Sequence, residues 1–193
     1  MDQWKYIIAI VAVLLTFVGY IPYIRNTIRG KTKPHVYTWF LWGFVTAIAF
    51  ALQVSGGAGI GSLVTLAAAL ACFIIFFFGM RIGKKDITTT DKIFLSSAIV
   101  ALGFWVFAKE PLISVIIVSL IDMLAFGPTI RKSYNKPYTE TLLSYVINTL
   151  RFGLAILALQ RYTVITTLYP LTWFFANGFF SIFLVLRRKR IVK

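Results

Sequence analysis

The chain of 193 residues is 59% hydrophobic and only 13% charged, and its mean hydropathy is +0.84. One soluble core of this size cannot bury so much apolar surface, so the composition excludes an ordinary soluble domain and favours an integral membrane protein. The net charge is +14, and because the basic residues lie at the ends of apolar segments, we expect them to contact anionic lipid headgroups and not nucleic acid.

Seven apolar stretches are long enough, or nearly so, to cross a hydrocarbon layer that needs roughly 20 residues per helix. In chain order they cover residues 4–25, 36–54, 58–80, 93–108, 111–131, 140–160 and 162–186. The fourth stretch is the shortest. The sequence therefore predicts an all-α integral membrane protein with seven transmembrane helices.

The basic residues lie mainly on one side of this predicted topology. The loops after the first, third and fifth helices share a side with the C-terminus, and this side holds sixteen Lys and Arg. The opposite side holds Lys5, Lys109 and Arg161. Because positively charged loops stay in the cytoplasm, we expect the N-terminus outside and the C-terminus inside, in a bacterial cytoplasmic membrane.

A short motif occurs twice, each time at the end of an apolar stretch. Pro22-Tyr23-Ile24-Arg25 and Pro128-Thr129-Ile130-Arg131 are 106 positions apart, and the same offset relates Arg81 to Arg187. Matches at a fixed offset indicate two copies of one membrane unit, and an odd helix between them lets both copies start on the same side. The predicted organisation is 3+1+3, two parallel three-helix repeats: a first bundle at 1–85, a linker helix at 86–110 and a second bundle at 111–193.

This layout and motif resemble the SWEET/PQ-loop superfamily, whose members have seven helices in a 3+1+3 arrangement. In that superfamily a Pro-Gln pair lies near the cytoplasmic end of the first and fifth helices. Tyr23 and Thr129 stand in place of the glutamines here, so the chain resembles a divergent member. Related SWEET-like folds include the nicotinamide riboside transporters and the KDEL receptors, so the resemblance by itself leaves the activity open.

The two motif prolines are candidate hinges. Proline lacks a backbone donor and clashes with the carbonyl group four residues earlier, so it bends a helix. Pro22 and Pro128 occupy matching positions near the predicted cytoplasmic ends, where bending would open and close an inner gate. The alternative is that they only shape the helix ends before each loop.

Two charged residues lie within the apolar stretches, where exposure of a charge to lipid is costly. Asp122 is near the middle of the fifth stretch and Arg151 near the middle of the sixth. Because these helices are consecutive and antiparallel, we predict that the two charges lie at similar depth and form a pair. The pair either holds the bundle together or faces the pathway, where it binds a polar solute or carries a proton.

Polar and aromatic residues form stripes on the last two predicted helices. Ser144, Asn148 and Arg151 share one face of the sixth helix, and Tyr169, Trp173 and Asn177 share one face of the seventh. An indole ring beside an amide suits a small polar solute with an apolar ring face. The candidate solute-binding residues are Asn177, Trp173, Asn148, Arg151, Asp122 and Trp42.

The resemblance adds to this list and also limits it. SWEET transporters have an asparagine in the seventh helix that lines the sugar site, with tryptophans nearby, and Asn177 resembles that asparagine by position. They also have an asparagine in the third helix, whereas the stretch 58–80 has none. Tyr20 and Tyr23, which lie near a predicted boundary, are interpreted as part of an aromatic belt.

The sequence offers little for catalysis. Because there is one cysteine, Cys72, and one histidine, His35, we expect no metal, no cofactor and no enzyme activity. Two function classes remain. The first is a transporter of a small polar solute (a sugar, nucleoside, vitamin or amino acid) that works by alternating access between two three-helix bundles. The alternative is a SWEET-like receptor or assembly factor that binds a ligand or partner without transport. The expected partners are the solute and the lipid bilayer, and a homo-oligomer is left open.

Overall fold

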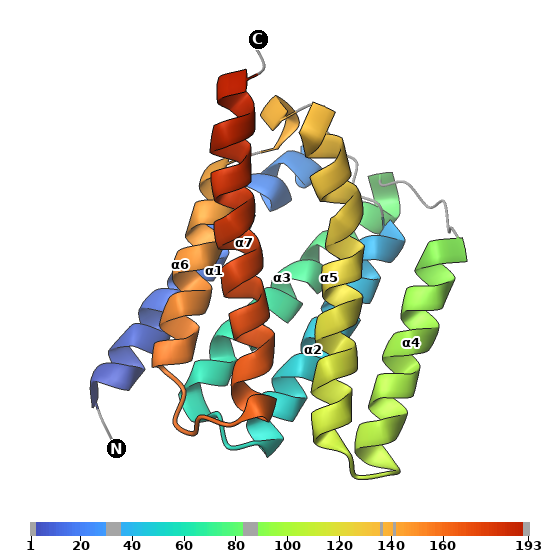
Figure 1. Ribbon diagram of the computed structural model, residues 1–193, viewed down its shortest axis with the longest axis vertical. Helices are drawn as coiled ribbons and strands as arrows, with labels where there is room; N and C mark the ends of the chain where they lie inside the picture. The colour runs from blue at the N-terminus through green and yellow to red at the C-terminus, as the bar shows by residue number, and fades with distance from the viewer. Residues whose placement is uncertain (1–2, 30–35, 83–88, 136, 141, 191–193) are drawn as a thin grey trace.

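The computed structural model describes residues 3–29, 36–82, 89–135, 137–140 and 142–190 (Figure 1). Their elements are α1 (Gln3–Ile28), α2 (Val36–Ser55), η1 (Gly59–Ser62), α3 (Leu63–Ile82), α4 (Thr89–Val106), α5 (Pro111–Asn135), η2 (Pro137–Thr139), α6 (Leu142–Leu157) and α7 (Val164–Arg190). The prediction of an all-α protein is confirmed for the described residues, and each predicted apolar stretch overlaps one of these α-helices.

Local sequence explains several helix ends. Helix α2 ends at a glycine-rich turn in which Gly57 and Gly59 have φ angles of 82° and 61°, a conformation that glycine adopts without steric cost. Helix α5 starts with Pro111, which is favourable in the first turn because its missing N–H has no helical partner there. Before α7, the backbone N–H of Thr166 donates to the hydroxyl of Thr163, which caps the helix.

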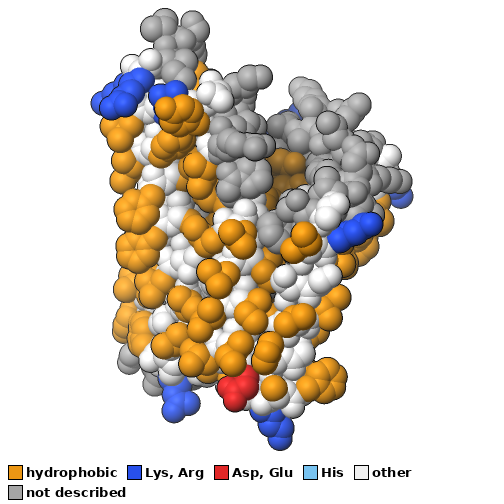
Figure 2. Space-filling model, turned by 45° about the vertical axis from the view of Figure 1, so that its right-hand side comes forward, with side chains coloured by type: hydrophobic (Ala, Val, Ile, Leu, Met, Phe, Trp, Pro, Cys, Tyr) orange, Lys and Arg blue, Asp and Glu red, His pale blue; other side chains and the backbone are white. Residues whose placement is uncertain are grey.

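The helices carry the apolar character of the chain on their outer surfaces. By length and composition α1, α2, the segment Gly59–Arg81 and α7 are suited to cross a membrane, whereas α4, α5 and α6 contain shorter apolar segments. Figure 2 shows hydrophobic side chains over much of one face, with Lys and Arg towards the margins of the view. Such a surface is compatible with an integral membrane protein. The count of seven membrane-spanning helices goes further and stays a prediction.

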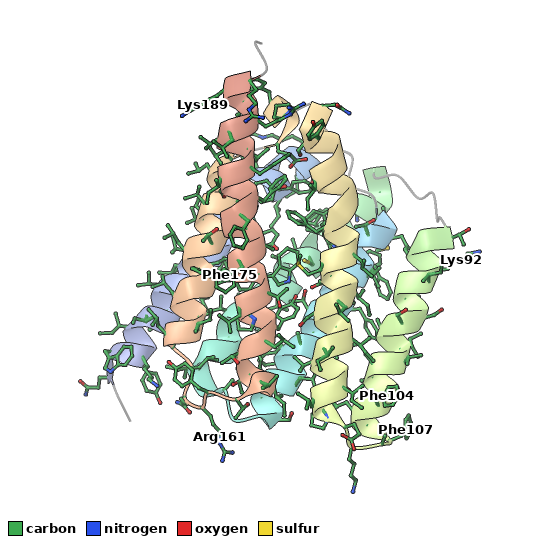
Figure 3. All side chains as sticks on the ribbon, viewed as in Figure 1. Lys92, Phe104, Phe107, Arg161, Phe175 and Lys189 are labelled. Carbon is green, nitrogen blue, oxygen red and sulfur yellow. The ribbon has the colours of Figure 1, made fainter. Side chains whose placement is uncertain are left out.

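In each half of the chain the third helix packs against both of the others. Helix α3 contacts α1 and α2, and α7 contacts α5 and α6. Between the halves α1 packs against α6 and α2 against α5, while α4 packs against α5 and α2. Helices α1, α3, α5 and α7 run from the end that holds the N-terminus towards the end that holds the C-terminus (Figure 1). In Figure 3, Lys92 and Lys189 lie towards the C-terminal end and Arg161 lies at the opposite end.

The same positions are buried in the two halves. The buried residues of α1 are Ala9, Ala12, Thr16 and Thr27, and 106 positions later α5 buries Val115, Val118, Asp122 and Ser133. At the same offset, the buried residues Arg151, Phe152, Ala155, Ala158 and Leu159 correspond to Val45, Thr46, Ala49, Leu52 and Gln53 on α2. The aromatic pair Tyr20–Trp39, with ring centres 6.3 Å apart, likewise corresponds to Phe126–Tyr145, with ring centres 6.1 Å apart.

For the third helix of each half the burial pattern fits an offset of 105. The buried residues Thr166, Tyr169, Pro170, Asn177, Phe180 and Leu184 of α7 correspond to Gly61, Val64, Thr65, Cys72, Ile75 and Gly79. The connection between the second and third helices is therefore one residue shorter in the second half. The offset of 106 that relates Arg81 to Arg187 does not extend to the buried faces of these helices.

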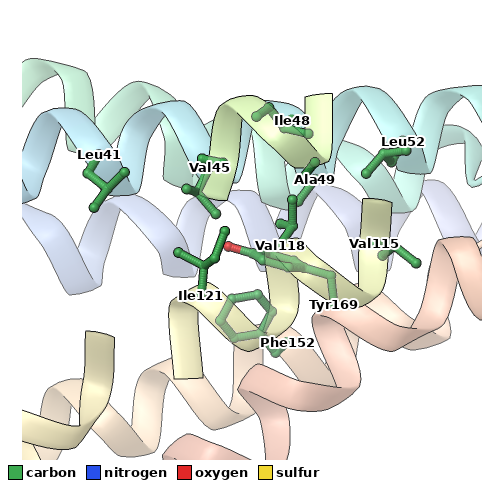
Figure 4. Close-up of a cluster of buried hydrophobic side chains, with 12 residues drawn as sticks. Leu41, Val45, Ile48, Ala49, Leu52, Val115, Val118, Ile121, Phe152 and Tyr169 are labelled. Atoms are coloured by element: carbon green, nitrogen blue, oxygen red, sulfur yellow. The ribbon is translucent and has the colours of Figure 1, made fainter. Parts of the chain in front are cut away.

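The largest group of buried apolar side chains lies where the halves meet. It includes Val45 and Leu52 from α2, Val118 and Ile121 from α5, and Tyr169 from α7 (Figure 4). Phe152 of α6 and small residues of α4 complete it. The polar groups described next lie against this core.

Candidate functional site

The carboxylate of Asp122 accepts two hydrogen bonds from α7. The hydroxyl of Tyr169 donates to Oδ2 over 2.7 Å, and the indole Nε1 of Trp173 donates to the same oxygen over 3.2 Å. Because Tyr169 donates to Asp122, its 3.1 Å bond with Thr46 on α2 has the threonine as donor. Asp122 is 1% exposed, and its Oδ1 is buried without a hydrogen-bond partner. This group joins α2, α5 and α7 around one buried charge.

The guanidinium of Arg151 lies at a different helix interface. Its Nε donates to Asn148 Oδ1 over 2.8 Å, and its Nη1 donates to Thr16 Oγ1 on α1 over 3.2 Å. Its Cζ lies 5.5 Å from the ring centre of Tyr20 and 4.4 Å from that of Phe152. Arg151 is 2% exposed, so this group places a second buried charge between α1 and α6.

The predicted pair of Asp122 and Arg151 is therefore wrong. Asp122 bonds to Tyr169 and Trp173, and Arg151 bonds to Asn148 and Thr16. The prediction assumed that consecutive helices are neighbours. Instead α7 packs against both α5 and α6, and the face of α6 that carries Arg151 turns towards α1.

Two aromatic rings lie between the charged groups. Phe152 and Trp173 are stacked, with ring centres 6.3 Å apart and planes 12° apart. The first of these rings contacts Arg151, and the second donates to Asp122. The structure thus places the two charges on either side of an apolar pair, where neither neutralises the other.

The remaining predicted site residues lie elsewhere. Asn177 is buried, but its Nδ2 donates to the carbonyl oxygen of Trp173 in its own helix. Trp42 packs edge-on against Trp39, and its buried Nε1 has no hydrogen-bond partner. Pro22 lies exposed within α1. Pro128 falls within the bounds of α5, but its side chain is outside the described residues.

Several residues of the site were not predicted. Thr16, Thr46 and Phe152 were not among the candidates, and Tyr20 was interpreted as part of an aromatic belt although it contacts Arg151. The predicted repeat offers a signal that points to Thr16. An offset of 106 relates the charged residue Asp122 to Thr16.

The connections α2–α3 and α6–α7 meet at the end of the molecule that holds the N-terminus. The backbone N–H of Gln160 donates to the carbonyl oxygen of Ala58 over 3.0 Å, and Lys5 Nζ donates to the carbonyl oxygen of Leu159 over 2.7 Å. A Cβ added to Gly61 would meet the backbone nitrogen of Leu159 at 2.8 Å. We call the contact of residues 57–61 with residues 158–161 the loop seal, because it joins the two halves and brings the backbone at Gly61 close to that of Ala158 and Leu159.

Comparisons with known proteins do not assign a family, since no family model, curated protein or solved structure matches this chain. Among the described residues, no group of three or more His, Cys, Asp and Glu is placed to hold a metal ion. The candidate site is therefore defined by its own geometry: two buried opposite charges, two stacked rings and a closed loop seal.

Proposed function

We propose that the protein is a membrane transporter that moves a small polar solute by alternating access between two three-helix bundles. The bundles are residues 1–85 and 111–193, and α4 links them. The observation that carries this proposal is that two buried charges, Asp122 and Arg151, lack a counter-charge at the contact between the halves. Tyr169 links Asp122 to Thr46 of the opposite half, and Arg151 donates directly to Thr16. Groups that are costly to bury and lie between moving units are typical of a solute pathway.

The repeated burial pattern supports the parallel repeats that this mechanism needs. Corresponding helices bury corresponding faces, and α1–α6 and α2–α5 are equivalent contacts between the halves. Two units related in this way can rock against each other about a site near the middle of the membrane, while each unit keeps its own packing. The arrangement of α1 and α5 in the same direction is also what two parallel copies require.

The loop seal is then the gate on the side of the N-terminus, which the distribution of basic residues assigns to the outside. In this proposal the contact between the two loops represents a state closed on that side. Transport requires the backbone contact between Ala58 and Gln160 to break, so that solute reaches the buried charges from outside. Pro22 lies on the other side of the site, where bending of α1 would open the inner gate.

A disulfide across the loop seal tests this function. A Cβ at Gly57 would lie 3.7 Å from the Cβ of Arg161, which matches the separation of about 3.8 Å in disulfides. Gly57→Cys/Arg161→Cys should therefore crosslink under oxidation, although a side chain at the φ angle of 82° costs about 1–2 kcal/mol.

The assay is flux of radiolabelled sugars, nucleosides, vitamins and amino acids into proteoliposomes. We expect flux of one solute class to stop when the double variant is oxidised and to return with a reductant, whereas each single cysteine variant stays active. Binding without flux across this panel would refute transport and favour the receptor or assembly function. Full flux through the crosslinked protein would refute the gating role of the loop seal.

A further inference from the structure

Arg151 is buried without a counter-charge. Its two hydrogen bonds go to the neutral oxygens of Asn148 and Thr16, and no carboxylate among the described residues lies within ion-pair distance of it. A guanidinium removed from water normally needs a negative partner to offset the loss of hydration. The contacts within the protein supply only part of that compensation.

The position in the first half of the chain that corresponds to Arg151 holds an uncharged residue, so helix packing does not require a cation there. Val45 is the residue of α2 that corresponds to Arg151, and it is 0% exposed. An aliphatic side chain therefore fills the equivalent place between α2 and α5. Since a buried charge is costly and a valine suffices in the other half, the arginine is expected to serve binding and not packing.

Two hydrogen bonds orient the guanidinium of Arg151, and its other N–H donors remain available to a ligand. Asn148 and Thr16 occupy two of its five N–H donors, and the hydroxyl of Thr16 is itself turned towards the carbonyl oxygen of Ala12. The rings of Tyr20 and Phe152 lie close to its Cζ. A planar fork held in this way matches the two oxygens of a carboxylate.

We infer that Arg151 binds the carboxylate of a small organic acid, so that the transported solute is a monocarboxylate and not a neutral sugar. One cation balances one negative charge, and Arg151 is the one buried cation among the described residues. A phosphate ester would leave a further charge uncompensated. Asp122, beyond the stacked rings of Phe152 and Trp173, repels a second negative group on the solute. This inference rests on the proposed transport function and names its substrate class.

The test compares acids with amides of the same shape. Purified full-length protein in detergent is titrated with acetate, pyruvate, benzoate and nicotinate, and with the corresponding amides, while tryptophan fluorescence is recorded. We expect at least one acid to bind about tenfold or more tightly than its amide, as loss of a charged hydrogen-bonding partner implies. Arg151→Gln should abolish this preference. Arg190→Gln, which removes an exposed cation at the end of α7, should retain it.

Equal binding of acid and amide, failure of every acid to bind, or an unchanged preference in Arg151→Gln would overturn the inference. Tighter binding of inorganic phosphate than of any acid would also overturn it. If Arg151→Gln does not fold, Arg151→Lys serves instead: it keeps the charge but loses the fork, so the preference should weaken and remain. A preference in that variant as strong as in the native protein would refute recognition by the fork.

Flux separates this inference from the proposed function. An acid that binds through Arg151 but shows no flux in proteoliposomes refutes transport and leaves the binding site in place. A neutral solute whose flux is unchanged in Arg151→Gln supports transport and refutes the carboxylate site. Flux of an acid that is lost in Arg151→Gln supports both.

Discussion

The hydroxyl of Tyr169 is the single atom that joins three helices at the buried carboxylate, and its removal has a predictable cost. Tyr169→Phe deletes the 2.7 Å bond to Asp122 and the 3.1 Å bond to Thr46 while it keeps the ring. Because the tyrosine is 2% exposed, water does not replace either bond. We expect Tyr169→Phe to lower the free energy of unfolding by about 1–3 kcal/mol.

The coupling between Tyr169 and Asp122 follows from the same geometry. Hydrogen bonds to charged groups contribute about 1.5–3 kcal/mol in soluble proteins, whereas polar pairs between membrane helices average about 0.6 and reach about 1.7 kcal/mol. Since this bond is short and its acceptor is a buried carboxylate, we place its coupling energy at about 1–2 kcal/mol. The double-mutant cycle uses Tyr169→Phe, Asp122→Leu and the combination of both.

Unfolding in mixed micelles of dodecyl maltoside and SDS, followed by tryptophan fluorescence, gives the free energies of unfolding. The matched control is the cycle of Asp122→Leu with Arg151→Leu. These two side chains have different partners, so their coupling should stay within about 0.5 kcal/mol. Strong coupling in the control together with none between Tyr169 and Asp122 would refute the assignment of contacts and restore the ion pair.

Three further outcomes are expected. Gly61→Ala should destabilise the protein by about 1–3 kcal/mol, because the new methyl group meets the backbone of Ala158 and Leu159 within 3.0 Å. In the same unfolding assay Gly103→Ala, which has open space around it, should be neutral or stabilise by about 0.5–1 kcal/mol. Equal effects of the two variants would show that the loop seal is not tightly packed. Pro22→Ala should slow solute flux more than it weakens solute binding, since it stiffens α1 away from the site, and an equal loss of both would mean that the proline only shapes the helix. In intact cells a membrane-impermeant maleimide should label Arg161→Cys and not Arg190→Cys, and the reverse pattern would overturn the orientation.

Helix positions were largely readable from the sequence because they depend on neighbouring residues. A run of apolar residues of membrane length, the turn at Gly57 and Gly59 and the proline at the start of α5 each act over a few positions. The matched prolines that led to the proposal of a repeat are also a local signal. Of the predicted solute-binding residues, Asp122, Trp173, Asn148 and Arg151 are buried or half-buried and form hydrogen bonds with other side chains, and their role in solute binding stays a prediction.

Which of these residues meet was decided only by tertiary packing. Asp122 and Arg151 lie at similar positions along consecutive helices, yet the third helix of each half packs against the first two, and the contacts between halves pair α1 with α6. A side chain 135 positions away in the chain, Thr16, therefore binds Arg151. The amide of Asn177 donates to a carbonyl oxygen of its own helix, and the spacing of residues alone does not show whether such an amide is bonded locally or is free to bind a solute. Periodicity in the sequence specifies the face of a helix on which a side chain lies. Which helix packs against that face depends on long-range contacts between apolar surfaces, and these contacts are not specific for one partner.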